Sequence, residues 1–289
     1  MSEHARICRI GPVVCGPRQL PVIIAGLCVL ESRELGFQVA ELLRNACDEA
    51  RLPLVFKASF DKANRSSIRS PRGPGLELGL KWLAEIRSAL DLPVTTDIHE
   101  PAQALPVAEV VDCLQIPAFL CRQTDLLLAA GEAAARHERA VNVKKGQFVA
   151  PREMLGVVRK LAEAGCGNVI LTERGTFFGY HRLVNDLIGI GDMMELPAPG
   201  GAPPVCWDIT HSTQLPGASD TTGGRPDRAP LLARAAAAIG THAIFLECHP
   251  DPPRAMSDAS TALPLSEVPH LLAQIAAIHR AASEMPEPA

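Results

Sequence analysis

The stretch Leu54–Ser67, LVFKASFDKANRSS, contains the pattern that decides the fold. It begins with three apolar residues, which are typical of a short buried strand. From Lys57 onward it turns polar, with two lysines, an arginine, an asparagine and an aspartate. A single turn of this composition is usually a solvated surface loop. Its meaning therefore depends on whether other strands of the chain end in the same way.

Short apolar segments followed by polar clusters recur along the chain. We predict strands over 21–25, 54–57, 93–96, 111–116, 140–143, 168–171, 205–208 and 243–246. Helices are expected over 32–46, 76–90, 124–138, 151–165 and 230–240, with a short helix from Pro101 and a last helix after Ser266. Ser32, Thr124 and Ser266 are the predicted N-caps of their helices. Continuously apolar strands that alternate with helices indicate a parallel sheet that the helices cover.

The number of strands favours a closed barrel. Eight strand–helix units in roughly 250 residues match a (β/α)8 TIM barrel, which is an α/β fold. A doubly wound open sheet is the alternative, but it gathers ligand groups at one switch point, and no G-x-G-x-x-G follows the first strand. We interpret residues 1–289 as one domain, with an N-terminal extension over 1–20 that contains a β-hairpin at 7–15, and a loose C-terminal tail at 285–289.

Composition excludes several classes of protein. The chain has 289 residues, of which 47% are hydrophobic and 21% charged, and its net charge is −4. A protein that coats nucleic acid would be strongly basic. No apolar run approaches the roughly 18 residues of a membrane span, and the N-terminus lacks the apolar core of a secretory signal. Nine cysteines without a C-x-x-C pair indicate reduced thiols, so we expect a cytoplasmic protein.

The strand ends carry the chemistry. In a closed barrel they share one mouth, which would gather Lys57, Lys62, Asp97, Gln115, Lys144, Arg174 and His211. Several cations in one cleft repel one another unless an anion lies between them. Phosphate or carboxylate ligands suit such a cleft, because arginine binds them as a fork and lysine as a point charge. A small anionic substrate is therefore expected.

A metal site is a second candidate at the same mouth. Its ligands would be Cys28, His211, Glu247 and Asp258, at the ends of the first, seventh and eighth strands and in the loop after the eighth. These strands are neighbours once the barrel closes. Thiolate, imidazole and carboxylate suit Zn²⁺ or Fe²⁺ better than Mg²⁺. On spacing alone, a cysteine at a strand end is more often a packing residue. The loops at 213–227 and 250–263 are long enough to cover the mouth.

The motifs taken together resemble one known family, the 3-deoxy-D-manno-octulosonate 8-phosphate (KDO 8-phosphate) synthases. They include IAGLCVLES, KASFDKANRSS, RGPGLELGL, TDIHEP, NVKKGQF, TERGTFFGY and DITHS, and they run in order from about residue 21 to 265. The resemblance implies a (β/α)8 barrel, usually a homotetramer. It also implies condensation of phosphoenolpyruvate with arabinose 5-phosphate, a step of lipopolysaccharide sugar biosynthesis.

The resemblance also assigns substrate roles to matching positions. The phosphoenolpyruvate group would comprise Lys57, Lys62, Gln115, Ala118, Phe119, Lys144 and Arg174. Asn64, Arg65 and Ser66 would bind arabinose 5-phosphate, and Arg122 would reach the sugar phosphate of a neighbouring subunit. The expected catalytic residues are Lys57, Lys62, Asp97, His99, Lys144 and His211.

Position 28 divides the resembled family by metal requirement. Members with asparagine there need no metal, whereas members with cysteine bind a divalent ion. This chain has Cys28, and His211, Glu247 and Asp258 stand where the other ligands are expected. The resemblance therefore implies a divalent metal, Zn²⁺ or Fe²⁺, with Mn²⁺ and other ions left open, and no organic cofactor.

Three rival interpretations remain open. A 3-deoxy-D-arabino-heptulosonate 7-phosphate (DAHP) synthase shares the barrel and phosphoenolpyruvate but uses erythrose 4-phosphate, and its segment resembles KPRTS rather than KANRSS. A sialic-acid synthase takes an unphosphorylated sugar, which Arg65 and Ser66 disfavour. A non-catalytic barrel would have lost its metal or proton-handling groups, which are present here.

Overall fold

Eight parallel strands form a closed barrel in a computed structural model, which describes residues 6–64, 71–217 and 223–285. Around the barrel they are β3 (Val22–Val29), β4 (Leu54–Ser59), β5 (Val94–Asp97), β6 (Cys113–Ile116), β7 (Ala140–Lys144), β8 (Val169–Glu173), β11 (Val205–Asp208) and β14 (Ala243–His249). Closure is completed by β14, which pairs with both β11 and β3. The predicted (β/α)8 barrel is confirmed, and the open sheet is excluded.

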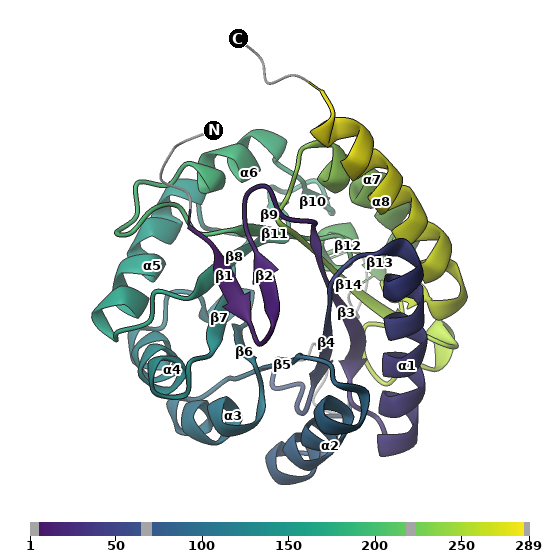
Figure 1. Cartoon of the computed structure of the whole chain (residues 1–289), viewed down its shortest axis with the longest axis horizontal. Helices are drawn as coiled ribbons and strands as arrows, with labels where there is room; N and C mark the ends of the chain where they lie inside the picture. Colours follow the sequence, from purple (N-terminus) through teal and green to yellow (C-terminus); the bar gives the residue numbers. More distant parts are fainter. Residues whose placement is uncertain (1–5, 65–70, 218–222, 286–289) are drawn as a thin grey trace.

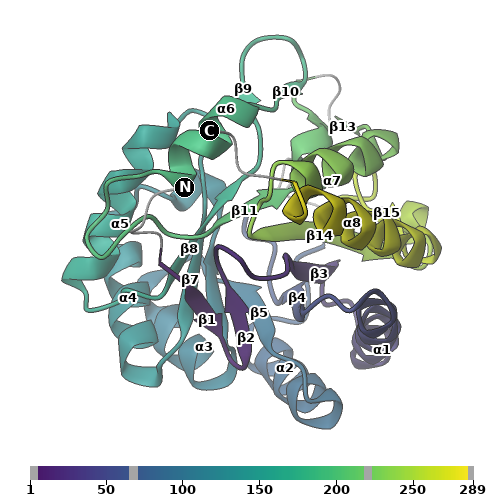
Figure 2. The same cartoon turned by 45° about the horizontal axis from the view of Figure 1, so that its top comes forward.

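Helices surround the barrel (Figure 1, Figure 2). They are α1 (Arg33–Ala50), α2 (Leu76–Leu90), α3 (Ala104–Val110), α4 (Thr124–His137), α5 (Met154–Glu163), α6 (Leu187–Met194), α7 (Ala229–Ala238) and α8 (Val268–Ser283). Short 3-10 turns are η1 (Pro101–Gln103), η2 (Ala118–Leu120), η3 (Pro151–Glu153), η4 (His211–Thr213), η5 (Pro226–Arg228), η6 (Pro252–Arg254) and η7 (Leu265–Glu267). The sequence did not predict α6, because its two glycines make it a poor helix former.

Of the three predicted N-caps, one is confirmed. The Ser32 hydroxyl accepts a hydrogen bond from Leu35 N at 3.1 Å. Thr124 is instead the first residue of α4, and Gln123 holds the cap position without a side-chain hydrogen bond. Ser266 lies inside η7, which runs directly into α8 and whose Leu265 carbonyl accepts from Val268 N. The preceding turn supplies that acceptor, so no serine cap is needed.

The core has two layers, which explains why the strands are apolar on both faces. Along β3, Val22 and Ile24 point into the barrel, whereas Ile23 and Ala25 pack against the helices. Several strands extend further than predicted, and β3 continues through Cys28. The prediction stopped where the sequence turned polar, but the backbone ladder continues and places those polar side chains at the barrel mouth.

The predicted N-terminal hairpin is confirmed as β1 (Cys8–Ile10) and β2 (Val13–Cys15), paired antiparallel. It lies across the opening of the barrel in Figure 1, and Cys8, Ile10 and Cys15 are buried in the inner core. The hairpin therefore closes the end of the barrel opposite the mouth. Residues 1–5 and most of the predicted tail, 286–289, lie outside the described residues. Among the described helices, none is both long and apolar enough to cross a membrane.

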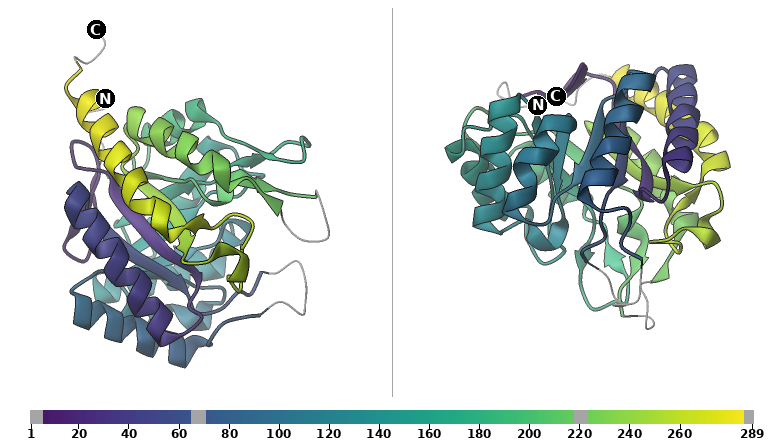
Figure 3. Two further views of the ribbon diagram at one scale, coloured as in Figure 1. Left: turned by 90° about the vertical axis from the view of Figure 1, so that its right-hand side faces the viewer. Right: turned by 90° about the horizontal axis from the view of Figure 1, so that it is seen from below.

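Short strand pairs lie at the other end of the barrel. Two are antiparallel: β9 (Thr176–Phe177) with β10 (Leu183–Val184), and β12 (Gln214–Leu215) with β13 (Gly223–Gly224). The third joins β15 (Leu263–Pro264) to β14. Figure 3 shows that the connections carrying β9, β10, β12 and β13 project from the end opposite the β1–β2 hairpin. The two long loops expected at the mouth thus contain residues that pair as short strands.

Candidate active site

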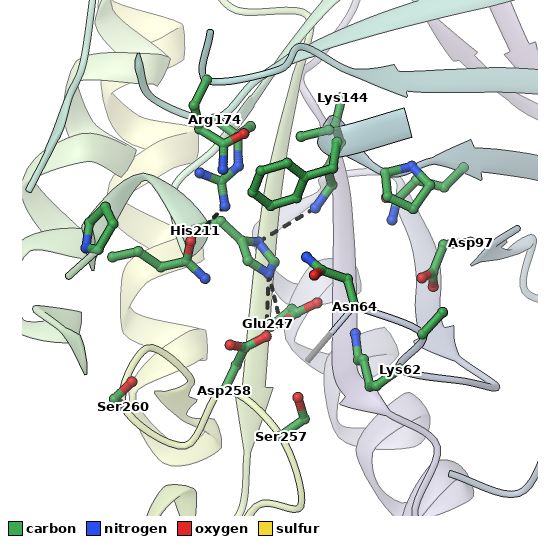
Figure 4. Close-up of a pocket in the computed structure, with 18 of the residues that line it drawn as sticks. Lys62, Asn64, Asp97, Lys144, Arg174, His211, Glu247, Ser257, Asp258 and Ser260 are labelled. Carbon is green, nitrogen blue, oxygen red and sulfur yellow. Dashed lines mark hydrogen bonds and ion pairs between the residues drawn. The ribbon is translucent and has the colours of Figure 1, made fainter. Parts of the chain in front are cut away.

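A cavity of about 830 Å³ opens at the carboxyl ends of the strands. Most of the predicted site residues line it: Lys57, Lys62, Asn64, Asp97, His99, Gln115, Ala118, Phe119, Lys144, Arg174, His211, Glu247 and Asp258. Arg122 is exposed and does not line the cavity. Arg65 and Ser66 lie outside the described residues. Figure 4 shows side chains from opposite walls converging on His211.

Lys57 and Glu247 are joined across the barrel wall. In the strand register Glu247 lies beside Gly26, and Gly26 lies beside Lys57. The Lys57 ammonium, 1% exposed, donates to Glu247 Oε1 and to the carbonyls of Leu27 and Cys28 at 3.2 and 3.0 Å. Burial opposes the charge of Glu247, but Lys57 and His211 outweigh it and lower the carboxyl pKa to about 2. Glu247 is therefore a carboxylate at neutral pH.

Cys28, Glu247 and Asp258 form a group that fits a metal ion. One ligand atom from each lies within 4.8 Å of the others. The Cys28 thiol donates to Asp258 Oδ2 at 3.0 Å. Burial, followed by the charges of Asp258 and Glu247, raises the pKa of the Cys28 thiol well above its ordinary value. A divalent cation would offset these charges and favour the thiolate.

His211 reaches the same group from η4, the turn that follows β11. Its Nε2 lies 3.5 Å from Glu247 Oε2 and 3.7 Å from Asp258 Oδ2. Glu247 Oε2 is buried and has no hydrogen-bond partner in the described part of the chain. A cation placed between these atoms would satisfy it. The four predicted ligands thus come together, and their sulfur, nitrogen and oxygen donors fit a borderline divalent ion.

The loop that carries Asp258 is held in an unusual conformation. Asp258 has a φ of +49°, in the left-handed region that few non-glycine residues adopt. Its carbonyl accepts from Thr261 N and Ala262 N at 2.9 and 3.0 Å, which stabilises the turn. Gly224 of β13 packs so closely on it that an added Cβ would lie 2.4 Å from Ser260 O. The two mouth loops therefore pack against each other and aim the Asp258 carboxylate inward.

Lys144 and Arg174 present cationic groups on the opposite wall. The Lys144 ammonium donates to Asp208 Oδ2 at 2.7 Å and lies 3.6 Å from the centroid of the Phe245 ring. Arg174 is 5% exposed and donates from Nη2 to Gln214 at 2.7 Å. Its Nη1 is buried without a hydrogen-bond partner among the described residues. Burial lowers the pKa of the Arg174 guanidinium, although the charges of Asp208 and Asp258 oppose the shift.

Lys145 shows how the strand pleat selects among neighbouring cations. It comes directly after Lys144, the last residue of β7, but its side chain points the other way and donates to the Val149 carbonyl at 3.0 Å. It also lies 3.3 Å from the Glu173 carboxylate. Successive side chains of a strand alternate in direction, so only Lys144 reaches the cavity.

Asp97 and His99 form a pair at the end of β5. His99 Nε2 lies 2.9 Å from Asp97 Oδ2, and both residues line the cavity. Burial opposes the charge of Asp97, but the His99 hydrogen bond and Lys62 outweigh it and hold the pKa of the carboxyl well below its usual value. The pair can therefore hold or pass a proton at the cavity wall.

Asp208 is a buried residue at this site that the sequence analysis did not single out. Its Oδ2 lies 2.7 Å from both Lys144 Nζ and His211 Nδ1. Burial opposes ionisation, but His211 and Lys144 outweigh it and lower the pKa of Asp208 well below its ordinary value. The available signal was its place as the first residue of DITHS, at the end of the seventh strand.

Comparison with known proteins places this geometry in a family. The model of the DAHP synthetase I family matches residues 5–282. The chain belongs to this family. Because the match spans nearly the whole chain, it includes every strand that contributes to the cavity.

Several curated relatives carry the same name, 2-dehydro-3-deoxyphosphooctonate aldolase, which is another name for KDO 8-phosphate synthase. The relative from Acinetobacter baylyi is 48% identical over 270 residues, which is 93% of this chain and 92% of its own. Those from Nitratidesulfovibrio vulgaris and Granulibacter bethesdensis are 52% and 50% identical over 257 and 276 residues. These two alignments cover 89% and 95% of this chain and 91% and 94% of the relatives. The resemblance to the KDO 8-phosphate synthases is confirmed.

Proposed function

We propose that this enzyme condenses phosphoenolpyruvate with D-arabinose 5-phosphate and water, giving 3-deoxy-D-manno-octulosonate 8-phosphate and inorganic phosphate. The observation that carries this function is near-50% identity to relatives named for this product across about nine-tenths of the chain. The cavity agrees with it, because buried cations face a group of side chains that could hold a metal ion. The reaction belongs to lipopolysaccharide sugar biosynthesis. None of the three relatives described above is named for the erythrose 4-phosphate alternative.

Arg174, Lys144 and Lys62 hold the phosphoenolpyruvate anion in this proposal. Arg174 Nη1 is buried without a hydrogen-bond partner among the described residues, and phosphate and carboxylate oxygens accept from such a donor in charge-assisted hydrogen bonds. Gln115 Oε1, which also lacks a partner there, is an acceptor and can bind a hydroxyl group or water beside the anion. Ala118 and Phe119 line the same wall. Lys57 contributes indirectly. Its ammonium already donates to Glu247 Oε1 and to the carbonyls of Leu27 and Cys28, so it holds Glu247 in place.

The bond changes define what the side chains must do. C3 of phosphoenolpyruvate attacks C1 of the sugar aldehyde, water adds at C2, and phosphate leaves by cleavage of its bond to C2. Lys144 and Arg174 stabilise the negative charge of the phosphate group that leaves C2. The Asp97–His99 pair orients the attacking water or passes its proton. Asp97, Lys144 and Arg174 are each only 5% exposed, so bulk water has little access to these groups.

A divalent metal is part of the proposal. Cys28, His211, Glu247 and Asp258 would hold it, and their donor set favours Zn²⁺ or Fe²⁺ while leaving Mn²⁺ and other ions possible. When bound, such an ion supplies Lewis-acid polarisation and a template for the aldehyde or water, without redox chemistry.

Sugar recognition occupies the remaining part of the mouth. Asn64 is exposed and lines the cavity, so it can meet arabinose 5-phosphate, with Arg65 and Ser66 at its phosphate. Arg122 would serve the site of a neighbouring subunit in a homotetramer. The enzyme would work in the cytoplasm as a single-domain barrel, without an organic cofactor.

One assay separates the two sugar substrates and tests the metal. Phosphoenolpyruvate consumption is measured with arabinose 5-phosphate and with erythrose 4-phosphate, each with and without EDTA followed by metal add-back. Turnover with arabinose 5-phosphate alone supports the proposal, and turnover with erythrose 4-phosphate alone contradicts it. Full activity in a rigorously metal-free sample contradicts the metal requirement while leaving the reaction intact.

A further inference from the structure

Asp208 lies behind the cavity wall and is fully buried. It is the last residue of β11 and does not line the cavity. Its carboxylate stands between two residues that do line it, Lys144 and His211. In the proposed function one of these neighbours binds substrate and the other binds the metal. Asp208 can therefore influence both without touching either ligand.

The hydrogen bonds of Asp208 fix its carboxylate in one orientation. Oδ1 accepts from the backbone N–H groups of Thr210 and His211 at 3.0 and 2.8 Å. Because these donors belong to the turn that follows the strand, they lock the plane of the carboxylate. Oδ2 is then left to accept from His211 Nδ1 and from the Lys144 ammonium. A rigid acceptor at Oδ2 selects which imidazole nitrogen carries a proton.

The other imidazole nitrogen faces the acidic group. His211 Nε2 lies 3.5 Å from Glu247 Oε2 and 3.7 Å from Asp258 Oδ2, and Figure 4 shows the ring between Lys144 and these two carboxylates. If Asp208 keeps the proton on Nδ1, the lone pair of the neutral ring is on Nε2. That lone pair then points to where Cys28, Glu247 and Asp258 converge.

We propose that Asp208 is a positioning residue that fixes the Nδ1–H tautomer of His211, so that Nε2 is the nitrogen presented to the metal. This inference rests on the proposed function for its purpose but on the observed contacts for its geometry. The same oxygen anchors Lys144, so the metal-facing and substrate-facing sides of the cavity share one support. Carboxylates that orient ligating histidines in this way set ligand tautomer and affinity in many metal sites.

The substitution Asp208→Asn tests the tautomer directly. Its amide replaces one acceptor oxygen with a donor, which disfavours a proton on His211 Nδ1. The matched control is Asp227→Asn, at a solvent-exposed aspartate in the connection between β11 and α7. Nitrogen chemical shifts are measured on metal-free protein with labelled histidines at alkaline pH, where the ring is neutral. His211 is assigned by the signals that vanish in His211→Gln.

We expect protonated Nδ1 in the unmodified protein and in Asp227→Asn, and protonated Nε2 in Asp208→Asn. Calorimetry with Zn²⁺ should then give a dissociation constant about 10–100-fold higher for Asp208→Asn than for either of the others. A protonated Nε2 in the unmodified protein overturns the proposal, and so does an unchanged tautomer in Asp208→Asn. Should that variant fail to fold, the tautomer of the unmodified protein decides alone.

The tautomer measurement also separates this inference from the proposed reaction. Because it uses metal-free protein and no substrate, it can succeed even if arabinose 5-phosphate is not turned over. Conversely, turnover without a tautomer change supports the reaction and overturns the role of Asp208. The variant Asp208→Glu keeps a carboxylate at this position. If the role of Asp208 is to orient His211, this variant should show the Nδ1–H signal that Asp208→Asn loses.

Discussion

Lys57 and Glu247 form a buried ion pair across β3, over a position that has no side chain. Gly26 lies between them in the strand register, and an added Cβ there would lie 1.9 Å from Lys57 O. Lys57 lies on β4, the second strand of the barrel, and Glu247 lies on β14, the last. Barrel closure through β3 therefore connects the cation-rich stretch with the group that could hold a metal ion.

Replacing Gly26 by alanine should destabilise the protein and reduce its activity. The new methyl group would push β3 away from β4, and overpacking of a core typically costs about 1–3 kcal/mol. Gly156 of α5 is the control, since an added Cβ there meets nothing within 4 Å. Gly156→Ala should raise helix stability by up to about 1 kcal/mol. Urea unfolding compares the two variants, and equal stabilities would contradict the close approach at Gly26.

Replacing Cys28 by alanine should remove most of the bound metal. The thiol is one of three ligand atoms within 4.8 Å of one another, and its loss should cost more than the about 10–100-fold typical of outer residues. Cys248, buried beside the site residue Glu247, provides the control Cys248→Ala. Metal content after gel filtration measures the effect. Metal retention equal to that of Cys248→Ala would remove Cys28 from the site.

A related substitution asks what the metal does. Cys28→Asn introduces asparagine, which the resemblance to the KDO 8-phosphate synthases associates with members that need no metal. If the ion acts only as a template, this variant should keep activity after EDTA treatment. Loss of activity in the metal-free variant, together with a normal fold by circular dichroism, would assign the ion a direct chemical role.

Much of the barrel was predictable because its signals are local. Apolar runs ending in polar clusters mark every barrel strand, and parallel pairing places the strand ends at one mouth. The proximity of Cys28 and Asp258 followed from barrel closure, although 230 residues separate them, whereas their interpretation as metal ligands rested on the family resemblance. Closure of the barrel makes such residues neighbours.

The missed features depend on contacts that sequence does not display. Asp208 looks like one more polar strand end, and only its distances to Lys144 and His211 reveal a shared acceptor. The close packing of Gly224 on Ser260 joins two loops whose pairing no local pattern encodes. The left-handed turn at Asp258 likewise depends on backbone hydrogen bonds within the folded loop.

Arg174→Lys should weaken phosphoenolpyruvate binding while keeping the charge. Lysine cannot reproduce the guanidinium fork, in which Nη2 is engaged by Gln214 and Nη1 has no partner among the described residues. Loss of one charge-assisted hydrogen bond costs about 1.5–3 kcal/mol, so KM for phosphoenolpyruvate should rise roughly 10–100-fold. Arg159→Lys, on the exposed face of α5, is the control. An increase only in the sugar KM would assign Arg174 to the other substrate.

Glu31→Ala should loosen the loop that carries Asp258. Glu31 Oε1 accepts from Met256 N at 2.9 Å and lies 3.5 Å from His249 Nε2. Without that acceptor, amides over 255–262 should exchange with solvent roughly tenfold faster or more, since a hydrogen bond to a charged group contributes about 1.5–3 kcal/mol. Glu41→Ala, on the exposed face of α1, should leave them unchanged. Equal exchange in both variants would show that other contacts hold the loop.

His242 makes stability depend on pH far from the proposed metal site. Burial lowers its pKa from 6.5 to about 4, and its Nδ1 accepts from Val205 N at 2.9 Å. Between these pH values the unfolded chain binds a proton that the folded protein does not, so the free energy of unfolding should fall as pH decreases, by on the order of 2 kcal/mol. His242→Gln keeps a hydrogen-bond acceptor but removes the titrating group, so its free energy of unfolding should fall less across that pH window. The control His270→Gln, at an exposed histidine, should lose as much stability as the unmodified protein. Urea unfolding at both ends of the window measures this difference, and identical losses in all three proteins would show that His242 is not the group responsible.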